Sequence, residues 1–148
     1  MQTLPRIALL LTLLWSTLAA GACPSGAEVK LTVLGSGGPE LGDKRASASY
    51  LVWLDGRARI LVDAGPGSSL YFERSGARLE DLSAILLTHL HADHSAALPA
   101  YVKGAYFTGR STALPVFGPA GNARMPSTSE FLHLLFGRGG AYRYLSDY

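Results

Sequence analysis

Short apolar runs separated by glycine-rich turns dominate the chain after residue 28 and predict a domain built around a sheet. Residues 29–34 alternate apolar and polar side chains, as in a strand with one buried face. Residues 49–54 and 58–62 are two β-rich runs joined through Asp55-Gly56, a strong hairpin signal. Residues 83–87 are apolar without alternation, which predicts a strand covered on both faces.

Helical patterns fall between and after these strands. Residues 68–74 predict a short helix, and residues 95–106 carry apolar side chains at helical spacing. Ser127-Thr128-Ser129-Glu130 is a capping box, which predicts the start of another helix. Residues 114–117 predict one more short strand, and residues 142–145 the beginning of a further one. Because strands and helices are interleaved, the predicted fold class is α/β or α+β.

The first 22 residues have the pattern of a secretory signal peptide. Arg6 precedes an apolar run over residues 7–14, and Ala20-Gly21-Ala22 fits a small-x-small cleavage site. The apolar run is shorter than the roughly 20 residues that a membrane span needs. We therefore expect a periplasmic or secreted protein, with residues 23–28 as a flexible mature N-terminus and residues 29–148 as the folded domain.

Cys23 is the only cysteine, so an intrachain disulfide is excluded. It would become the first mature residue, the position that carries the lipid in bacterial lipoproteins. Ala20 stands where leucine is usual in that pattern, so an ordinary free cysteine is favoured. A membrane partner is expected only if Cys23 is lipidated.

Composition and charge fit one globular domain and no special partner class. The 148 residues are 48% hydrophobic and 16% charged, with a formal net charge of +2. This charge is too weak to predict a nucleic-acid-binding surface or an acidic partner.

The segment His89-Leu90-His91-Ala92-Asp93-His94 holds three of the four histidines and follows the predicted strand 83–87 directly. Neutral imidazole and carboxylate are ligands that suit zinc and related transition metals. On a loop leaving the strand, His89 and His91 can converge on one metal. Asp93 and His94 turn towards a second position. Two metals that hold a water suit hydrolysis at carbonyl, phosphoryl or sulfuryl centres.

Three other features carry weaker signals. The glycine-rich residues 35–46 follow a strand, but they lack the dinucleotide and P-loop spacings, so a turn is favoured over a phosphate cradle. Asp63 stands at the end of a predicted strand. Capping of local backbone amides and a role in the site are two interpretations of this aspartate, and the sequence favours neither. His133 is interpreted as a surface or packing residue of the last helix.

The segment Thr88–His94 resembles the signature of the metallo-β-lactamase-fold hydrolase superfamily. Residues 33–38, the hairpin and the strand end at 61–65 resemble the same superfamily, and residues 114–119 resemble its ribonuclease Z-like branch. The resemblance runs from about residue 29 to about residue 136. It implies an αββα sandwich, of which this chain supplies the N-terminal half.

The resemblance also implies roles for individual residues. His89 and His91 would bind one zinc, Asp93 and His94 a second, and Asp93 would also carry a proton. Asp63 and Thr88 would support the ligands without binding metal. A complete site would hold two Zn²⁺ ions, with Mn²⁺ or Fe²⁺ also open.

The superfamily completes its site with further histidines and an aspartate C-terminal to this region, and this chain has no matching motif. We therefore expect an exported zinc-dependent hydrolase, truncated and weakly active or inactive as this chain, with an apolar sheet face left exposed. The resemblance favours a small-molecule phosphodiester or sulfate ester, with lactone, β-lactam and thioester also open. The leader and the lack of a basic stripe argue against nucleic acid. The alternative is a non-catalytic metal-binding half-domain that acts through a partner chain; the oligomeric state is open.

Overall fold

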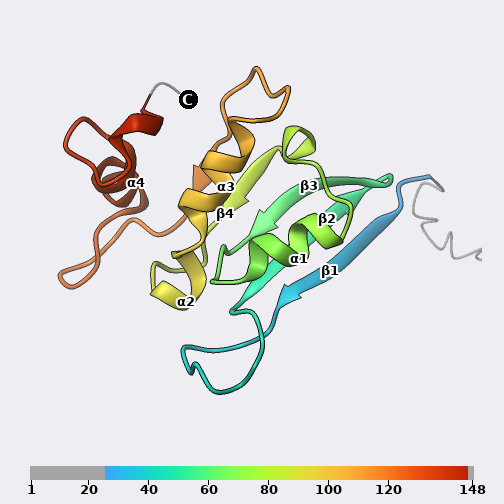
Figure 1. Cartoon of the computed structure of the whole chain (residues 1–148), viewed down its shortest axis with the longest axis horizontal. Coiled ribbons are helices and arrows are strands. Elements are labelled where there is room, and N and C mark those ends of the chain that lie inside the picture. Colours follow the sequence, from blue (N-terminus) through green and yellow to red (C-terminus); the bar gives the residue numbers. More distant parts are fainter. Residues whose placement is uncertain (1–25, 147–148) are drawn as a thin grey trace, which may run out of the picture.

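The computed structural model describes residues 26–146, so the predicted signal peptide and Cys23 lie outside the described residues. Five strands form one sheet in the order β1-β2-β3-β4-β5 (Figure 1). The strands are β1 (Val29–Gly35), β2 (Ser49–Leu54), β3 (Arg57–Val62), β4 (Ala84–Leu86) and β5 (Val116–Phe117).

Helices α1 and α3 lie across the same face of this sheet, and α4 lies beyond the β5 side (Figure 1). No helix within residues 26–146 is both long enough and apolar enough to cross a membrane. The α-helices are α1 (Ser68–Arg74), α2 (Ala92–Ser95), α3 (Leu98–Ala105) and α4 (Thr128–Phe136), and the 3₁₀ turns are η1 (Leu79–Asp81) and η2 (Arg143–Leu145).

The β2–β3 connection is the expected hairpin. The two strands pair antiparallel, and the two residues between them have positive φ angles, 50° at Asp55 and 74° at Gly56. A two-residue turn with both φ angles positive matches the twist of the flanking strands, and Asp-Gly adopts it readily.

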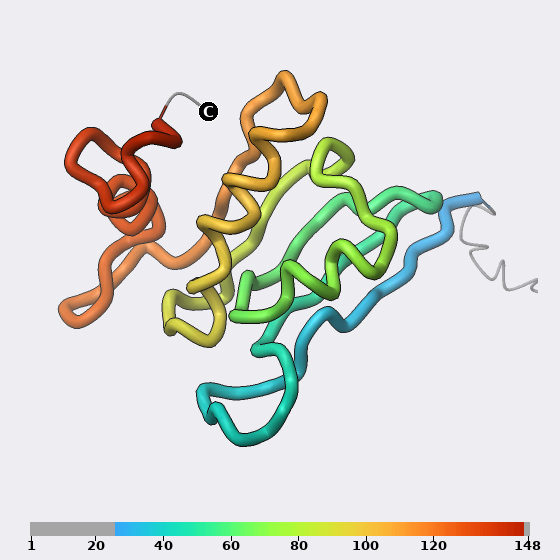
Figure 2. The backbone as a smooth tube through the Cα atoms, viewed as in Figure 1, coloured from blue at the N-terminus to red at the C-terminus, as the bar shows by residue number. Residues whose placement is uncertain are grey.

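The strand directions bring four loops to one edge of the sheet. β1, β2 and β3 are antiparallel neighbours, whereas β3, β4 and β5 run parallel, so β1, β3, β4 and β5 all point the same way. Their carboxyl ends therefore lie at a common edge of the sheet. The loops that leave these strands can be traced along the backbone in Figure 2. Ligands of open α/β sheets bind at such an edge. The loops that leave it are 36–48, 63–67, 87–91 and 118–127.

The core lies between the sheet and the helices α1 and α3. Leu51, Leu61 and Ile85 are register partners on three adjacent strands, and each is fully buried. Leu98 and Tyr101 of α3 are buried in the same cluster. This packing holds α3, and with it the segment that precedes α3, against β4.

The opposite face of the sheet exposes apolar side chains. The register places Val33, Tyr50, Val62, Leu86 and Phe117 in one row across all five strands. Val33 is 55% exposed, Leu86 37% and Phe117 58%. The prediction of a strand covered on both faces is therefore wrong for β4, because the described helices cover only one face. The expected exposed apolar face is present.

Two further expectations differ from the structure. The helix predicted over residues 95–106 is confirmed as α3, but it begins at Leu98, and Ser95 instead ends the preceding helix α2. Pro99 lies in the first turn of α3, where proline is well tolerated. The strand predicted over residues 142–145 is the turn η2 instead. The backbone N–H of Tyr142 donates to the carbonyl of Leu135 in α4, at 2.6 Å, rather than to a neighbouring strand.

Candidate metal centre

The histidine loop is defined here as residues 89–94, which follow β4 and run into α2. Asp63 lies at the end of β3, and its side chain is almost fully buried. Its φ of 58° is left-handed, a conformation that aspartate tolerates better than most residues. Its carboxylate does not cap local amides. Oδ1 accepts the backbone N–H of Thr88 at 2.8 Å, and Oδ2 lies 2.8 Å from Nδ1 of His94. Asp63 therefore ties the end of β3 to the loop that follows β4.

The contact with Asp63 sets the tautomer of His94. A carboxylate can only accept, so Nδ1 of His94 carries the proton that lies between the two groups. In the neutral ring, Nε2 then keeps its lone pair, the form in which an imidazole binds metal. Oδ2 of Asp93 lies 3.4 Å from this Nε2 atom.

Thr88 connects the Asp63 carboxylate to His89 and so sets the tautomer of His89. The Thr88 hydroxyl has one proton, which it donates to the Asp63 carboxylate at 2.8 Å from Oδ2. Its oxygen must then accept from Nδ1 of His89, 3.1 Å away. His89, like His94, is thereby left with a lone pair on Nε2. One buried carboxylate orients two imidazoles.

The three imidazole rings of the loop lie together. The ring centroids of His89 and His94 are 3.9 Å apart, and those of His89 and His91 are 4.7 Å apart. His133 is exposed on α4. The structure thus brings together Asp63, Thr88, His89, His91, Asp93 and His94.

The donors fit zinc in chemistry and tautomer, but not in arrangement. Protein zinc sites have three or four protein ligands. Within residues 26–146, no group of three or more His, Cys, Asp or Glu side chains has an arrangement that could hold a metal ion. The loop therefore supplies part of a ligand set, and the metal roles predicted for its residues stay predictions.

Several residues that support the loop had no signal in the sequence. The N–H of Ala64 donates to the carbonyl of His94 at 2.7 Å, and the Ser95 hydroxyl donates to the carbonyl of His91 at 3.0 Å. At Gly65, a Cβ atom would lie 2.4 Å from the carbonyl oxygen of Asp93. The sequence marks this glycine only as part of the strand end at residues 61–65, whereas the structure needs it for this close backbone approach.

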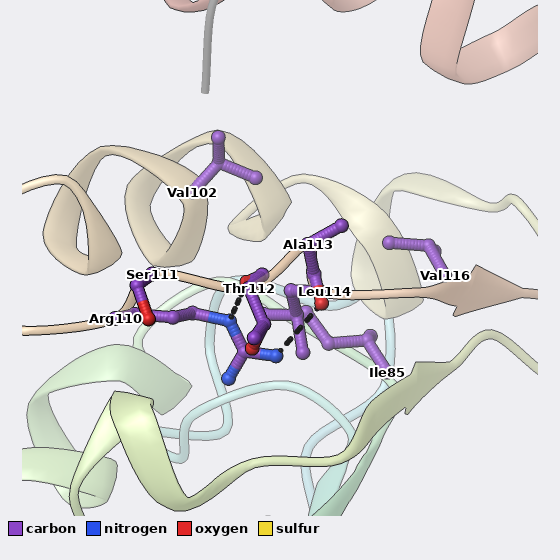
Figure 3. Close-up of a pocket in the computed structure, with 8 residues that line it drawn as sticks. All are labelled: Ile85, Val102, Arg110, Ser111, Thr112, Ala113, Leu114 and Val116. Carbon is purple, nitrogen blue, oxygen red and sulfur yellow. Dashed lines mark hydrogen bonds between the residues drawn. The ribbon is translucent and has the colours of Figure 1, made fainter.

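A cavity of about 340 Å³ at the amino ends of β4 and β5 is distinct from this centre (Figure 3). Arg110 lies in its wall, but its guanidinium donates to the carbonyls of Leu79, Leu82, Thr112 and Ala113. The remaining lining residues are mostly apolar or small. Because these carbonyls hold the guanidinium, Arg110 ties two loops together and is not set up to bind an anion.

A family model described as the metallo-beta-lactamase superfamily matches residues 42–144. The chain belongs to the metallo-β-lactamase superfamily. The matched residues include the whole network from Asp63 to His94. The resemblance first seen in the histidine signature is therefore confirmed over most of the chain.

Individual relatives point to one branch. The chain is 38% identical over 117 residues to Ribonuclease Z of Mycobacterium sp. (strain KMS), covering 78% of this chain and 40% of that protein. Among solved structures, human tRNase Z, short form, is similar with a TM-score of 0.54 and 25% identity, covering 62% of this chain and 35% of that one. A diphosphatase from the PhnP family is similar with a TM-score of 0.56 and 27% identity, covering 75% and 47%. The chain thus spans less than half the length of each, as expected for part of the αββα fold.

These relatives overturn one expectation. The sequence favoured a small-molecule substrate and disfavoured nucleic acid, but the relatives are named Ribonuclease Z and tRNase Z. The expectation was wrong because it relied on the leader, the lack of a basic stripe and the weak net charge, which describe the sequence as a whole and not the local charge of a site. Bound cations are often the largest local charges in a site, and no composition counts them.

Proposed function

We propose that this protein contributes the histidine loop of a metal-dependent phosphodiesterase that acts on RNA. The observation that carries the proposal is the hydrogen-bonded network in which Asp63 orients His94 directly and His89 through Thr88. Such a network has no use in a hydrophobic core. It is the arrangement by which proteins present imidazole nitrogens to a metal.

The donors divide into the predicted ligands and their supports. His89, His91, Asp93 and His94 would hold the metal, while Asp63 and Thr88 keep two of the rings in the binding tautomer. Zinc, when bound, supplies a Lewis acid and makes hydroxide available near neutral pH. The carboxylate of Asp93 is the group at this loop that can take up a proton and return it to a leaving oxygen.

The relatives favour phosphorus over the other ester types. Two are named for ribonuclease activity and a third is a diphosphatase, so each name refers to a bond at phosphorus. None of these three proteins is named for a sulfate ester, lactone, β-lactam or thioester. Because the chain spans 40% of the length of the mycobacterial relative, the activity of the whole protein is part of the proposal.

RNA cleavage by the purified protein tests this function. The 148-residue chain, supplied with Zn²⁺, is incubated with end-labelled tRNA and with a single-stranded RNA, and the products are separated on a gel. We expect slow cleavage that stops with a chelator and in His91→Ala. Cleavage that persists in His91→Ala, or turnover of an aryl sulfate or lactone with intact RNA, would contradict the proposal.

We also propose that the protein is exported, on the basis of residues 1–22. Intact-mass measurement of the protein recovered from the periplasm and the medium tests this. A mature chain that begins at Cys23 is expected. A full-length chain confined to the cytoplasm would contradict it.

The exposed sheet face favours a second candidate, a metal-binding half-domain that pairs with a second copy of itself. From the spacing between strands and the rise per residue, the projected area of this face is roughly 400 Å². Two such faces packed together would bury a total accessible area on the order of 1,000 Å², near the lower limit for a specific interface. Light scattering after gel filtration should then give twice 15.7 kDa. Leu31→Lys on the face should restore the monomer, whereas Leu41→Lys in the loop should not; these residues are 61% and 100% exposed. A monomeric wild type would rule this candidate out.

A further inference from the structure

A cavity of about 330 Å³ opens directly beside the histidine loop. One wall is the histidine loop itself, and the other is the loop that follows β5. Both leave the carboxyl edge of the sheet. The residues that line the cavity are His89, Leu90, His91, Pro119, Ala120, Gly121, Asn122 and Met125. Such a volume is at the lower end of the range for small-ligand sites.

The second wall is a formed turn that Asn122 closes. The Asn122 N–H donates to the Met125 carbonyl at 2.8 Å. In return, Oδ1 of Asn122 accepts the N–H groups of Arg124 and Met125, at 2.8 and 3.1 Å. Thr128 anchors the start of the loop, because its N–H and its hydroxyl both donate to the Pro119 carbonyl. The shape of this wall therefore does not depend on a ligand.

These bonds leave one polar group of the wall without a partner. Two backbone N–H groups donate to Oδ1 of Asn122, so Nδ2 is the atom of this exposed carboxamide that is left for a ligand in the cavity that Asn122 lines. Among residues 26–146, Nδ2 of Asn122 donates to no protein acceptor, so two N–H donors are available. Leu90, Pro119 and Met125 supply apolar surface in the same cavity.

We propose that this cavity holds a nucleobase of the RNA substrate, next to the phosphodiester at the histidine loop. A base is a flat ring with an apolar face and acceptor atoms at its edge. It can pack against the apolar wall while Nδ2 of Asn122 donates to a ring nitrogen or carbonyl. The thioether of Met125 makes favourable contacts with aromatic rings. The choice of RNA rests on the proposed function, but binding of a base can be measured without catalysis.

Binding of adenosine 5′-monophosphate and ribose 5-phosphate, followed by NMR titration of the metal-free 148-residue chain, tests the proposal. The two probes differ only in the base. We expect the nucleotide to bind about tenfold more tightly, with shifts centred on residues 119–125, given the apolar contacts and one hydrogen bond. Equal affinities would overturn the proposal.

Asn122→Asp is the decisive variant because its carboxylate can still accept from Arg124 and Met125, so the turn persists. It lacks the Nδ2 donors, and the nucleotide should bind about fivefold to tenfold more weakly, the loss of one hydrogen bond. Ala123→Asp adds the same charge at the neighbouring exposed position and should leave the ratio of the two affinities unchanged. Equal losses in both variants would overturn the proposal.

The same titration separates this proposal from the proposed function. If RNA is not cleaved but the nucleotide still binds in an Asn122-dependent way, the base site stands and the nuclease function fails. If RNA is cleaved but the base adds nothing to binding, the nuclease function stands and the base site fails.

Discussion

Replacing Asp63 by asparagine should change the proton position on His94 while leaving the fold in place. The side chains are nearly the same size, so the orientation of the amide decides the outcome. The Thr88 N–H lies 2.8 Å from Oδ1 and can only donate, so the asparagine oxygen must take that place. The new NH₂ group then occupies the Oδ2 position and donates to Nδ1 of His94. The proton of His94 is thereby forced onto Nε2.

The magnitude follows from the contacts that are lost. Exchange of a charge-assisted hydrogen bond for a neutral one should lower the free energy of unfolding by about 1–2 kcal/mol. Loss of an oriented support of this kind typically weakens metal binding by about 10- to 100-fold. Asp63→Ala should be less stable by about 3 kcal/mol or more, because it leaves Thr88 and His94 unpaired and puts alanine at a positive φ.

Two measurements check the prediction. Long-range ¹H–¹⁵N NMR of the imidazoles reports which nitrogen of His94 carries the proton, and competition with a chromophoric chelator reports Zn²⁺ affinity. Asp55→Asn is the matched control, because Asp55 also has a positive φ but lies exposed in the hairpin turn. If Asp63→Asn keeps the Nδ1–H form of His94 and binds zinc like this control, the assignment of Asp63 is refuted.

Three further predictions address the same structure. Thr88→Val keeps the backbone N–H that donates to the Asp63 carboxylate but removes the hydroxyl. The free energy of unfolding should fall by about 1 kcal/mol. Imidazole NMR should show a mixture of the two tautomers at His89 and no change at His94. An unchanged His89 spectrum would contradict the relay. Gly65→Ala places a Cβ 2.4 Å from the Asp93 carbonyl, so denaturant titration should show a loss of about 2 kcal/mol; wild-type stability would show that the loop can move aside. Burial raises the pKa of Tyr101 above its usual value near 10, against the opposing effect of its hydrogen bond to Ser68. The native state therefore holds this proton longer than the unfolded state, and the stability difference between wild type and Tyr101→Phe should shrink as pH rises above about 10. A difference that stays constant there would refute this.

Much of the fold could be predicted because the deciding interactions are local. Asp55-Gly56 supports a two-residue turn by its own backbone preferences, and the Ser127 hydroxyl accepts from the N–H of Glu130, as the capping box predicts. The segment 89–94 also stands out locally, since three imidazoles and a carboxylate within six residues are typical of a metal site, and that assignment stays a prediction. His133, interpreted as a surface or packing residue of the last helix, is exposed on α4.

Only the tertiary structure decided the role of Asp63. Its partners Thr88 and His94 are 25 and 31 residues away, so no local pattern distinguishes a turn-capping aspartate from one that orients imidazoles. The same holds for Gly65, whose need for a hydrogen side chain comes from the backbone of Asp93. The parallel pairing of β3 with β4 places the ends of these strands side by side, and that pairing creates the centre. The sequence by itself determined which donors the candidate site contains. The sheet topology determined which of them meet and which nitrogen of His89 and of His94 carries the proton, because those properties depend on contacts between segments far apart in the chain.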